Sequence, residues 1–154
     1  MASLAYIATM FADFLSRLTK PDPDPLADSD ARLALTALLV RIARSDGAYE
    51  TSEKERIAAI CEARYGLSGA DATELLASAE GLESEAPDTI RFTRAIKDAV
   101  VYEDRIAVIE ALWQVALADG ARDAKEDALI RMASSFLGVS DMDSAQARRR
   151  VTPS

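Results

Sequence analysis

Residues 39–48, with the sequence LVRIARSDGA, recur as residues 112–121, with the sequence LWQVALADGA. In both stretches a leucine is followed one helical turn later by an alanine, so that both side chains lie on one face of a helix. Each stretch then reaches an Asp-Gly pair, and glycine commonly ends a helix because it adopts the left-handed backbone conformation readily. The sequence therefore predicts two equivalent helices that stop at Asp46-Gly47 and at Asp119-Gly120.

The likeness extends well beyond the two Asp-Gly turns. Leu39, Ala43, Asp46, Gly47, Ala48, Glu53 and Ile57 recur as Leu112, Ala116, Asp119, Gly120, Ala121, Glu126 and Ile130. Glu50 is replaced by Asp123, which keeps the charge. After a gap of one residue, Gly66-Leu67-Ser68 with Asp71 is echoed by Gly138-Val139-Ser140 with Asp143. We interpret residues 39–71 and 112–143 as an internal repeat.

Each repeat unit predicts a helix, an Asp-Gly turn, a second helix, a glycine stop and a third helix that begins with a serine cap. One unit alone is too small to bury its apolar face, so we expect the two units to pack together. The predicted fold is all-α, a bundle of about seven helices built from two helix-turn-helix repeats related by pseudo-twofold symmetry. No segment alternates apolar and polar residues strongly enough to indicate a strand.

The rest of the chain divides into three parts. Residues 1–20 carry apolar side chains at helical spacing, which predicts an N-terminal amphipathic helix. Residues 21–29 contain alternating prolines, which disfavour a helix and predict an extended Pro/Asp linker. Residues 30–151 then form the helical domain. The N-terminal helix is expected either to dock on this domain or to present its apolar face to another protein.

Within the helical domain, the pattern predicts individual elements. A helix that starts at Asp30 has a wide apolar face, and its polar face carries Arg32, Thr36, Arg41 and Arg44. A second helix is predicted from Ser52 to Tyr65, with Gly66 as its stop. Residues 81–88 are predicted to form a loop. Phe92, Trp113 and Cys61 lie at core-like helical spacing, so we expect all three side chains to be buried.

The composition excludes several kinds of chemistry. The 154 residues are 49% hydrophobic and 29% charged, which fits a single compact domain. There is no histidine, and Cys61 is the single cysteine. Catalytic sites that pair serine or cysteine with histidine, disulfide frameworks, and zinc sites built on histidine or several cysteines are therefore ruled out. We expect no enzymatic activity.

The charge and the hydropathy pattern limit the partners. The chain has 26 acidic and 18 basic residues and a formal net charge of −8. Because nucleic acids are bound by clustered lysine and arginine, no nucleic-acid partner is expected. Asp13 and Arg17 interrupt the N-terminal apolar stretch, which is too short to span a membrane and lacks the start of a signal peptide. We predict a cytoplasmic protein that binds another protein and does not insert into a membrane.

The carboxylates of the two turns are the candidate metal ligands. They are Asp46, Glu50 and Glu53 in the first copy and Asp119, Asp123 and Glu126 in the second. Hard divalent cations prefer carboxylate oxygens, and calcium tolerates irregular geometry better than magnesium or manganese. The spacing also suits a second interpretation, in which these residues start helices through a capping box and the helix dipole. Paired carboxylates can also perform hydrolysis, but only in a deep pocket that joins them.

The chain resembles a known family at several motifs. These are Leu39 to Asp46-Gly47 with Glu53, Phe92-Thr93-Arg94, Leu112-Trp113 to Asp119-Gly120 with Glu126-Asp127, and Leu137-Gly138-Val139-Ser140. In these motifs residues 30–151 resemble the tellurite-resistance TerB-like family, in particular a proteobacterial branch with a short N-terminal helix and linker. A more distant similarity is to the N-terminal domain of DjlA-type co-chaperones.

The resemblance implies an all-helical fold and a role in stress or tellurite resistance, without an established reaction. The chain departs from the family pattern after each Asp-Gly pair, where Ala48 and Ala121 stand in place of an acidic residue and Arg122 in place of an apolar one. The leading hypothesis is a non-enzymatic interaction module in bacterial stress or tellurite resistance. The alternative is a protein that binds or senses a divalent cation at the two Asp-Gly turns.

Overall fold

The computed structural model of the chain describes residues 4–20, 26–45, 49–118 and 124–152. These residues form eight α-helices and no strand. The helices are α1 (Leu4–Leu18), α2 (Asp28–Ser45), α3 (Thr51–Tyr65), α4 (Gly69–Glu85), α5 (Thr89–Ala99), α6 (Tyr102–Ala118), α7 (Ala124–Phe136) and α8 (Asp141–Val151). The all-α prediction is confirmed. None of the described helices has the length and apolar character that crossing a membrane requires.

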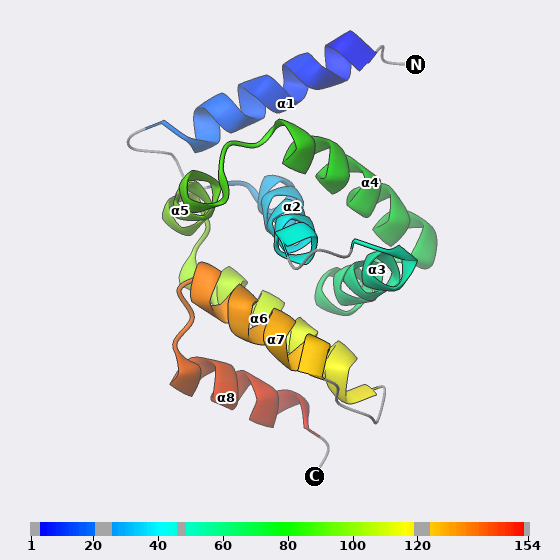
Figure 1. Cartoon of the computed structure of the whole chain (residues 1–154), viewed down its shortest axis with the longest axis vertical. Helices are drawn as coiled ribbons and strands as arrows, with labels where there is room; N and C mark the ends of the chain where they lie inside the picture. Colours follow the sequence, from blue (N-terminus) through cyan, green and yellow to red (C-terminus); the bar gives the residue numbers. More distant parts are fainter. Residues whose placement is uncertain (1–3, 21–25, 46–48, 119–123, 153–154) are drawn as a thin grey trace.

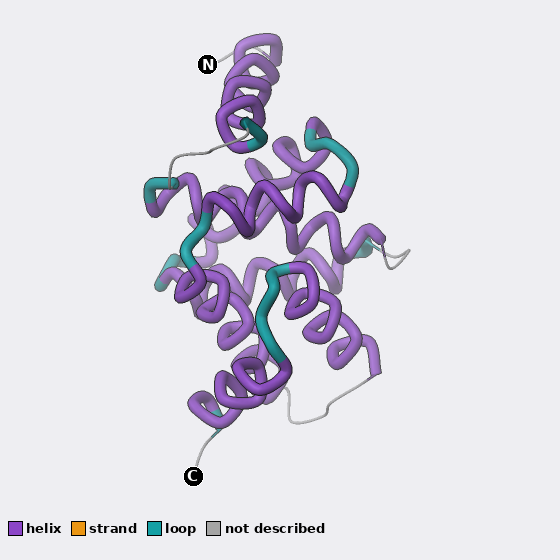
Figure 2. The backbone as a smooth tube through the Cα atoms, turned by 90° about the vertical axis from the view of Figure 1, so that its left-hand side faces the viewer, coloured by secondary structure: helices purple, strands orange, loops and turns teal. Residues whose placement is uncertain are grey.

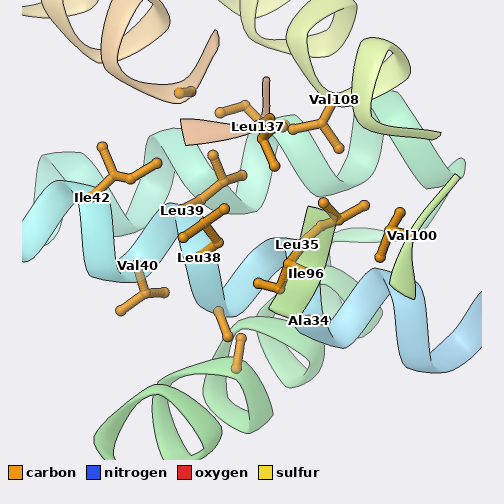
Figure 3. Packing of buried hydrophobic residues seen from close by; sticks show 14 of the residues in the cluster. Ala34, Leu35, Leu38, Leu39, Val40, Ile42, Ile96, Val100, Val108 and Leu137 are labelled. Carbon is orange, nitrogen blue, oxygen red and sulfur yellow. The ribbon is translucent and has the colours of Figure 1, made fainter. Parts of the chain in front are cut away.

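The helix α2 lies at the centre of the molecule. It packs against α3, α4, α5 and α7, while α1 lies across one end of the bundle and α8 at the other (Figure 1). Figure 3 shows Leu39 and Ile42 on the side of α2 that faces Leu137, and Val40 on the opposite side. Because neighbours surround α2, even Thr36 is buried, and its hydroxyl donates to the Arg32 carbonyl at 2.7 Å. On the predicted polar face, Thr36 is therefore buried and Arg41 is largely covered, whereas Arg44 is exposed.

Two predicted boundaries are wrong. The helix α2 begins at Asp28 rather than at Asp30, and α4 continues to Glu85 through residues predicted as a loop. The reason for the second difference is that Leu82 and Glu83 are buried. Leu82 fills the core, and the Glu83 carboxylate accepts a hydrogen bond from Arg41, so the last turn of α4 is held by tertiary contacts that local sequence does not reveal.

Four helix ends follow the predicted signals, whereas the predicted stops at Asp46-Gly47 and Asp119-Gly120 lie outside the described residues. Gly66 after α3 and Gly138 after α7 have φ angles of 64° and 68°, the left-handed conformation that favours glycine. Ser68 and Ser140 cap the next helices, where their hydroxyls accept from the backbone N–H of Asp71 at 3.2 Å and of Asp143 at 3.1 Å. These four positions match pairwise between residues 39–71 and residues 112–143.

The N-terminal helix docks on the bundle. Phe14, Leu15 and Leu18 of α1 are buried, and the helix packs against α4 and α5 (Figure 2). Gly81 of α4 permits this close approach, since a Cβ atom at this position would lie 2.8 Å from Cε2 of Phe11. Of the two roles predicted for this helix, the structure therefore displays docking.

The predicted core residues are buried as expected. Phe92, Cys61 and Trp113 all belong to the main hydrophobic cluster. The Trp113 indole N–H donates to the Ser144 hydroxyl at 3.1 Å, so its polar group is satisfied inside the core.

Candidate functional site

The predicted metal ligands divide between described and undescribed parts of the chain. Asp46, Asp119 and Asp123 lie outside the described residues, and of Glu126 only the backbone, in the first turn of α7, is described. Glu50 and Glu53 are described completely, at the start of α3. No group of three or more potential metal-ligating side chains lies together among the described residues, so the metal site stays a prediction.

Glu50 and Glu53 occupy the first turn of α3. Glu50 is the N-cap residue, and its backbone carbonyl accepts from the N–H groups of Glu53 and Lys54, both at 3.1 Å. Its carboxylate is exposed and makes no capping hydrogen bond. The Glu53 carboxylate accepts from the Ser52 hydroxyl at 2.9 Å, and this bond lowers the pKa of Glu53. Helix initiation here therefore uses the Glu50 backbone and leaves its side chain available.

A cluster of charges surrounds Tyr49, immediately before Glu50. We call it the Tyr49 cluster, and it comprises Arg44, Tyr49, Lys54, Glu80 and Glu83. The Arg44 guanidinium carbon lies 4.8 Å from the centroid of the Tyr49 ring and the Lys54 ammonium 5.3 Å from it, both at cation–π distance. Lys54 also pairs with Glu80 at 3.6 Å. The ring of Tyr49 thus anchors the chain that enters α3.

The Tyr49 hydroxyl is buried and has no hydrogen-bond partner among the described residues. Burial raises the pKa of this hydroxyl, and the nearby Glu80 carboxylate raises it further. The group therefore stays protonated at neutral pH, so Tyr49 contributes packing and a potential hydrogen-bond donor but no negative charge.

Glu83 links the Tyr49 cluster to the core of the bundle. Its carboxylate accepts from Arg41 Nε at 2.6 Å and pairs with Arg44 Nε at 3.1 Å. Arg41 also donates to the backbone carbonyl of Pro87 at 2.8 Å and to that of Glu83 at 3.1 Å. This arrangement ties α2 to the last turn of α4 and to the connection that leads into α5.

These groups offer little for covalent chemistry. The Cys61 thiol is buried 3.6 Å from the Thr36 hydroxyl, and burial raises its pKa, which keeps it protonated and unreactive. The Glu80 and Glu83 carboxylates are engaged by cations. At the start of α3 the exposed Glu50 and the partly exposed Glu53 present carboxylates to solvent, next to the exposed Lys54.

The fold and this site define a class: a small all-α domain with acidic residues at a helix start and, beside them, a charge network around the buried Glu83. Comparison with protein families shows which family of this class the chain belongs to. The model of the family described as tellurite resistance protein TerB matches residues 32–149, and the chain belongs to this family. No curated protein matches the chain, and no solved structure does.

Sequence reasoning missed the Tyr49 cluster and the Arg41–Glu83 pair beside it. The pattern predicts a polar helix face for Arg41 and Arg44 and a loop for Glu83. A signal was nonetheless present, because Arg41 lies between the buried positions Val40 and Ile42 of a helix that is apolar on most sides. A charged residue in such a place requires a partner, but the sequence does not say which carboxylate supplies it.

Proposed function

We propose that this chain is a non-enzymatic interaction module of the TerB family that acts through a protein partner in bacterial stress or tellurite resistance. The observation that carries the proposal is the family match over residues 32–149, which spans α3 to α7 completely. The description of the family connects it to tellurite resistance, and we extend that connection to this chain. We place its action in the cytoplasm.

The chemistry of the described side chains supports a role without catalysis. The chain has no histidine to act as a base near neutral pH. Its one thiol is buried beside Thr36, and the Glu80 and Glu83 carboxylates form ion pairs with Lys54 and Arg44. Such a network fixes the shape of a surface, as an interaction module requires, and supplies no activated nucleophile.

A genetic experiment tests the leading proposal. Deletion of the gene should lower the tolerance of the cell to tellurite and to oxidants, and the wild-type gene should restore it. The variant Glu50→Gln with Glu53→Gln removes the described charges of the first turn and should restore less. Glu55→Gln is the matched control, because Glu55 is exposed on the same helix and carries the same charge.

Two results would contradict this proposal. One is unchanged tolerance to tellurite and oxidants after deletion, together with affinity purification that recovers no reproducible partner. The other is a measurable catalytic turnover that is lost in the Glu50→Gln, Glu53→Gln variant. Circular dichroism of each variant measures its helix content and so distinguishes loss of folding from loss of function.

A second function, binding or sensing of a divalent cation at the two Asp-Gly turns, is favoured by two observations at the start of α3. The Glu50 carboxylate makes no capping bond, and the lowered pKa of Glu53 keeps its carboxylate ionised. We propose that Asp46, Glu50 and Glu53, and in the second copy Asp119, Asp123 and Glu126, provide oxygen ligands. Calcium fits such sparse ligands better than magnesium or manganese, because it accepts irregular coordination.

Nuclear magnetic resonance tests the cation proposal directly. Calcium, magnesium and manganese are titrated while the backbone amides of residues 46–53 and 119–126 are followed. A saturable change confined to these amides, and lost in the Glu50→Gln, Glu53→Gln variant, is expected. The absence of any saturable change with all three metals would remove this function and leave the interaction module.

We further propose that residues 39–71 and 112–143 form two related halves with pseudo-twofold symmetry. The matched glycine stops at Gly66 and Gly138 support this relation, as do the matched serine caps at Ser68 and Ser140. The packing of α2 against α4 and of α6 against α8 follows the same order in each half. On this proposal, the two acidic turns are copies of one functional element.

A further inference from the structure

A cavity of about 290 Å³ lies between α2, the end of α3 and the start of α6. It is lined by Ala31, Arg32, Leu35, Arg64, Tyr65 and Asp104. The side chains of Arg64 and Asp104 are partly exposed, so the cavity is accessible from solvent at this side. None of these residues takes part in the Tyr49 cluster or in the two acidic turns.

Two guanidinium groups converge on the ring of Tyr65. The guanidinium carbons of Arg32 and Arg64 lie 5.0 Å and 5.1 Å from the ring centroid. Arg64 Nη2 approaches Asp104 Oδ1 at 3.5 Å, whereas no carboxylate among the described side chains forms an ion pair with Arg32. The residues that line the cavity therefore carry one carboxylate and two guanidinium groups, a formal charge of +1.

Two polar atoms at this cavity are buried without a hydrogen-bond partner among the described residues. They are the Tyr65 hydroxyl and Arg64 Nε. Burial raises the pKa of Tyr65, so its hydroxyl is a protonated donor. The charges of Arg64 and Arg32 lower this pKa by a smaller amount, and the charge of Asp104 raises it. Buried donors without acceptors are rare in proteins, because leaving a buried donor unpaired is unfavourable. A ligand that carries acceptor oxygens would supply the kind of partner that these two donors lack among the described residues.

We propose that this cavity binds a small organic monocarboxylate. Arginine presents a planar set of donors that matches a carboxylate, and the Tyr65 hydroxyl supplies one more. Ala31 and Leu35, which are buried apolar residues, contact the hydrocarbon part of the ligand. The volume lies near the lower end of the range for ligand pockets, which restricts the ligand to a few carbon atoms.

Asp104 limits the cavity to ligands with a single negative charge. A second carboxylate or a doubly charged phosphate would meet the Asp104 carboxylate at the mouth of the cavity and be repelled. A monoanion instead matches the single positive charge that remains. The selectivity expected is therefore butyrate over succinate and over inorganic phosphate.

Titration of the full chain with butyrate, followed by nuclear magnetic resonance, tests the proposal. The backbone amides of Arg32, Arg64 and Tyr65 should shift saturably, with a dissociation constant on the order of 1 mM for a ligand of this size. Tyr65→Phe removes the hydroxyl and keeps the ring. Because the hydroxyl has no partner, this variant should keep its melting temperature and lose about tenfold in affinity for butyrate.

Three further variants sharpen the test. Arg32→Gln should weaken butyrate binding by at least about tenfold, since it removes a charge-assisted contact. Arg149→Gln is the matched control, because Arg149 is exposed on α8 and outside the cavity, and it should bind butyrate as the wild type does. Asp104→Asn should gain affinity for succinate relative to butyrate.

Several results would overturn the proposal. These are no saturable shift with butyrate, equal affinity in Arg32→Gln and Arg149→Gln, and tighter binding of succinate or phosphate than of butyrate by the wild type. Saturable binding of a tripeptide through its C-terminal carboxylate, without binding of butyrate, would also overturn it and assign the cavity to the end of a partner chain. The outcome is independent of the metal titration, which follows other amides.

Discussion

At the scale of the residue, Glu83 is the most constrained charged group that the structure describes. It is buried and pairs with both Arg41 and Arg44, while Arg41 makes further hydrogen bonds to carbonyls near the end of α4. A buried ion pair adds little net stability compared with apolar residues of similar size, but loss of one partner leaves the other buried and uncompensated. Removal of Glu83 alone should therefore be strongly destabilising, although the ion pair itself adds little net stability.

Glu83→Ala should lower the free energy of unfolding by about 3–5 kcal/mol, because it leaves the Arg41 guanidinium inside the protein without its carboxylate. Chemical denaturation measures the change. Glu85→Ala, at an exposed position of the same helical turn, should alter the free energy of unfolding by no more than about 0.5 kcal/mol. Equal effects of the two substitutions would show that the buried pair does not hold the end of α4.

The raised pKa values of the Tyr49 and Tyr65 hydroxyls predict that the protein loses stability at alkaline pH. Burial raises the pKa of both hydroxyls above the ordinary value of 10.0, so the folded protein binds protons that the unfolded chain releases. The stabilising contribution is complete below pH 10.0 and is lost as the pH rises above it. Denaturation at increasing pH, with tyrosinate absorbance read in parallel, should show unfolding and ionisation together.

The double variant Tyr49→Phe, Tyr65→Phe provides the control for this pH dependence. It removes both buried hydroxyls, neither of which has a hydrogen-bond partner among the described residues. Its free energy of unfolding should therefore depend less on pH in the alkaline range. An alkaline transition as steep as that of the wild type would assign the pH dependence to other groups.

At the scale of the element, the glycines that end α3 and α7 have the same backbone conformation but different neighbours. Gly66 and Gly138 have nearly the same positive φ. A Cβ atom at Gly66 would meet nothing within 4 Å, whereas one at Gly138 would lie 3.1 Å from Lys97 Cδ and 3.3 Å from Arg105 Nη1. Arg105 is not free to withdraw without loss, since it donates to the Leu137 carbonyl at 2.6 Å.

Gly66→Ala should therefore lower the free energy of unfolding by about 1–2 kcal/mol, the backbone cost of the left-handed conformation alone. Gly138→Ala should cost more, because the new methyl group also crowds Arg105. Thermal and chemical unfolding measure both, with Gly69→Ala as the control. Gly69 lies in the first turn of α4 without a positive φ, so alanine there should be tolerated. A smaller effect at Gly138 than at Gly66 would contradict the crowding.

The elements show where sequence reasoning succeeds and where it fails. Helix stops at Gly66 and caps at Ser68 and Ser140 are local signals, set by the backbone of a few neighbouring residues, and they were predicted correctly. The last turn of α4 depends on Leu82 and on the pairing of Glu83 with α2, which is distant in the sequence. No local pattern contains that information, and the predicted loop over residues 81–88 was wrong for this reason.

At the scale of the whole molecule, α1 is joined to the bundle through a close contact. Phe11 lies against Gly81, where a side chain would collide with its ring. Gly81→Ala should therefore displace α1 and increase hydrogen exchange over residues 4–18. The double variant Phe11→Ala, Gly81→Ala removes the collision and should restore part of the protection. Unchanged exchange in Gly81→Ala would show that α1 is held by Phe14, Leu15 and Leu18 alone.

The candidate site was only partly accessible to sequence reasoning. The likeness of residues 39–71 to residues 112–143 singles out the acidic positions, since Glu50 and Glu53 have counterparts in Asp123 and Glu126. The cavity beside Tyr65 was not foreseen, because it unites α2, α3 and α6 and no motif links Arg32 with Asp104. Sites formed by distant elements depend on packing, and periodicity predicts which face of a helix is buried but not which residues meet there.

The central place of α2 has a consequence for the synthesis of the protein. Of the helices that pack on it, α7 leaves the ribosome last, about ninety residues after α2 ends. At translation rates of about 5–20 residues per second, α2 waits roughly 5–20 s with part of its apolar surface uncovered. During that time the nascent chain presents the kind of segment that chaperones bind. The time for which a chaperone could bind α2 during synthesis therefore depends on the number of residues between α2 and α7, the last helix that covers it.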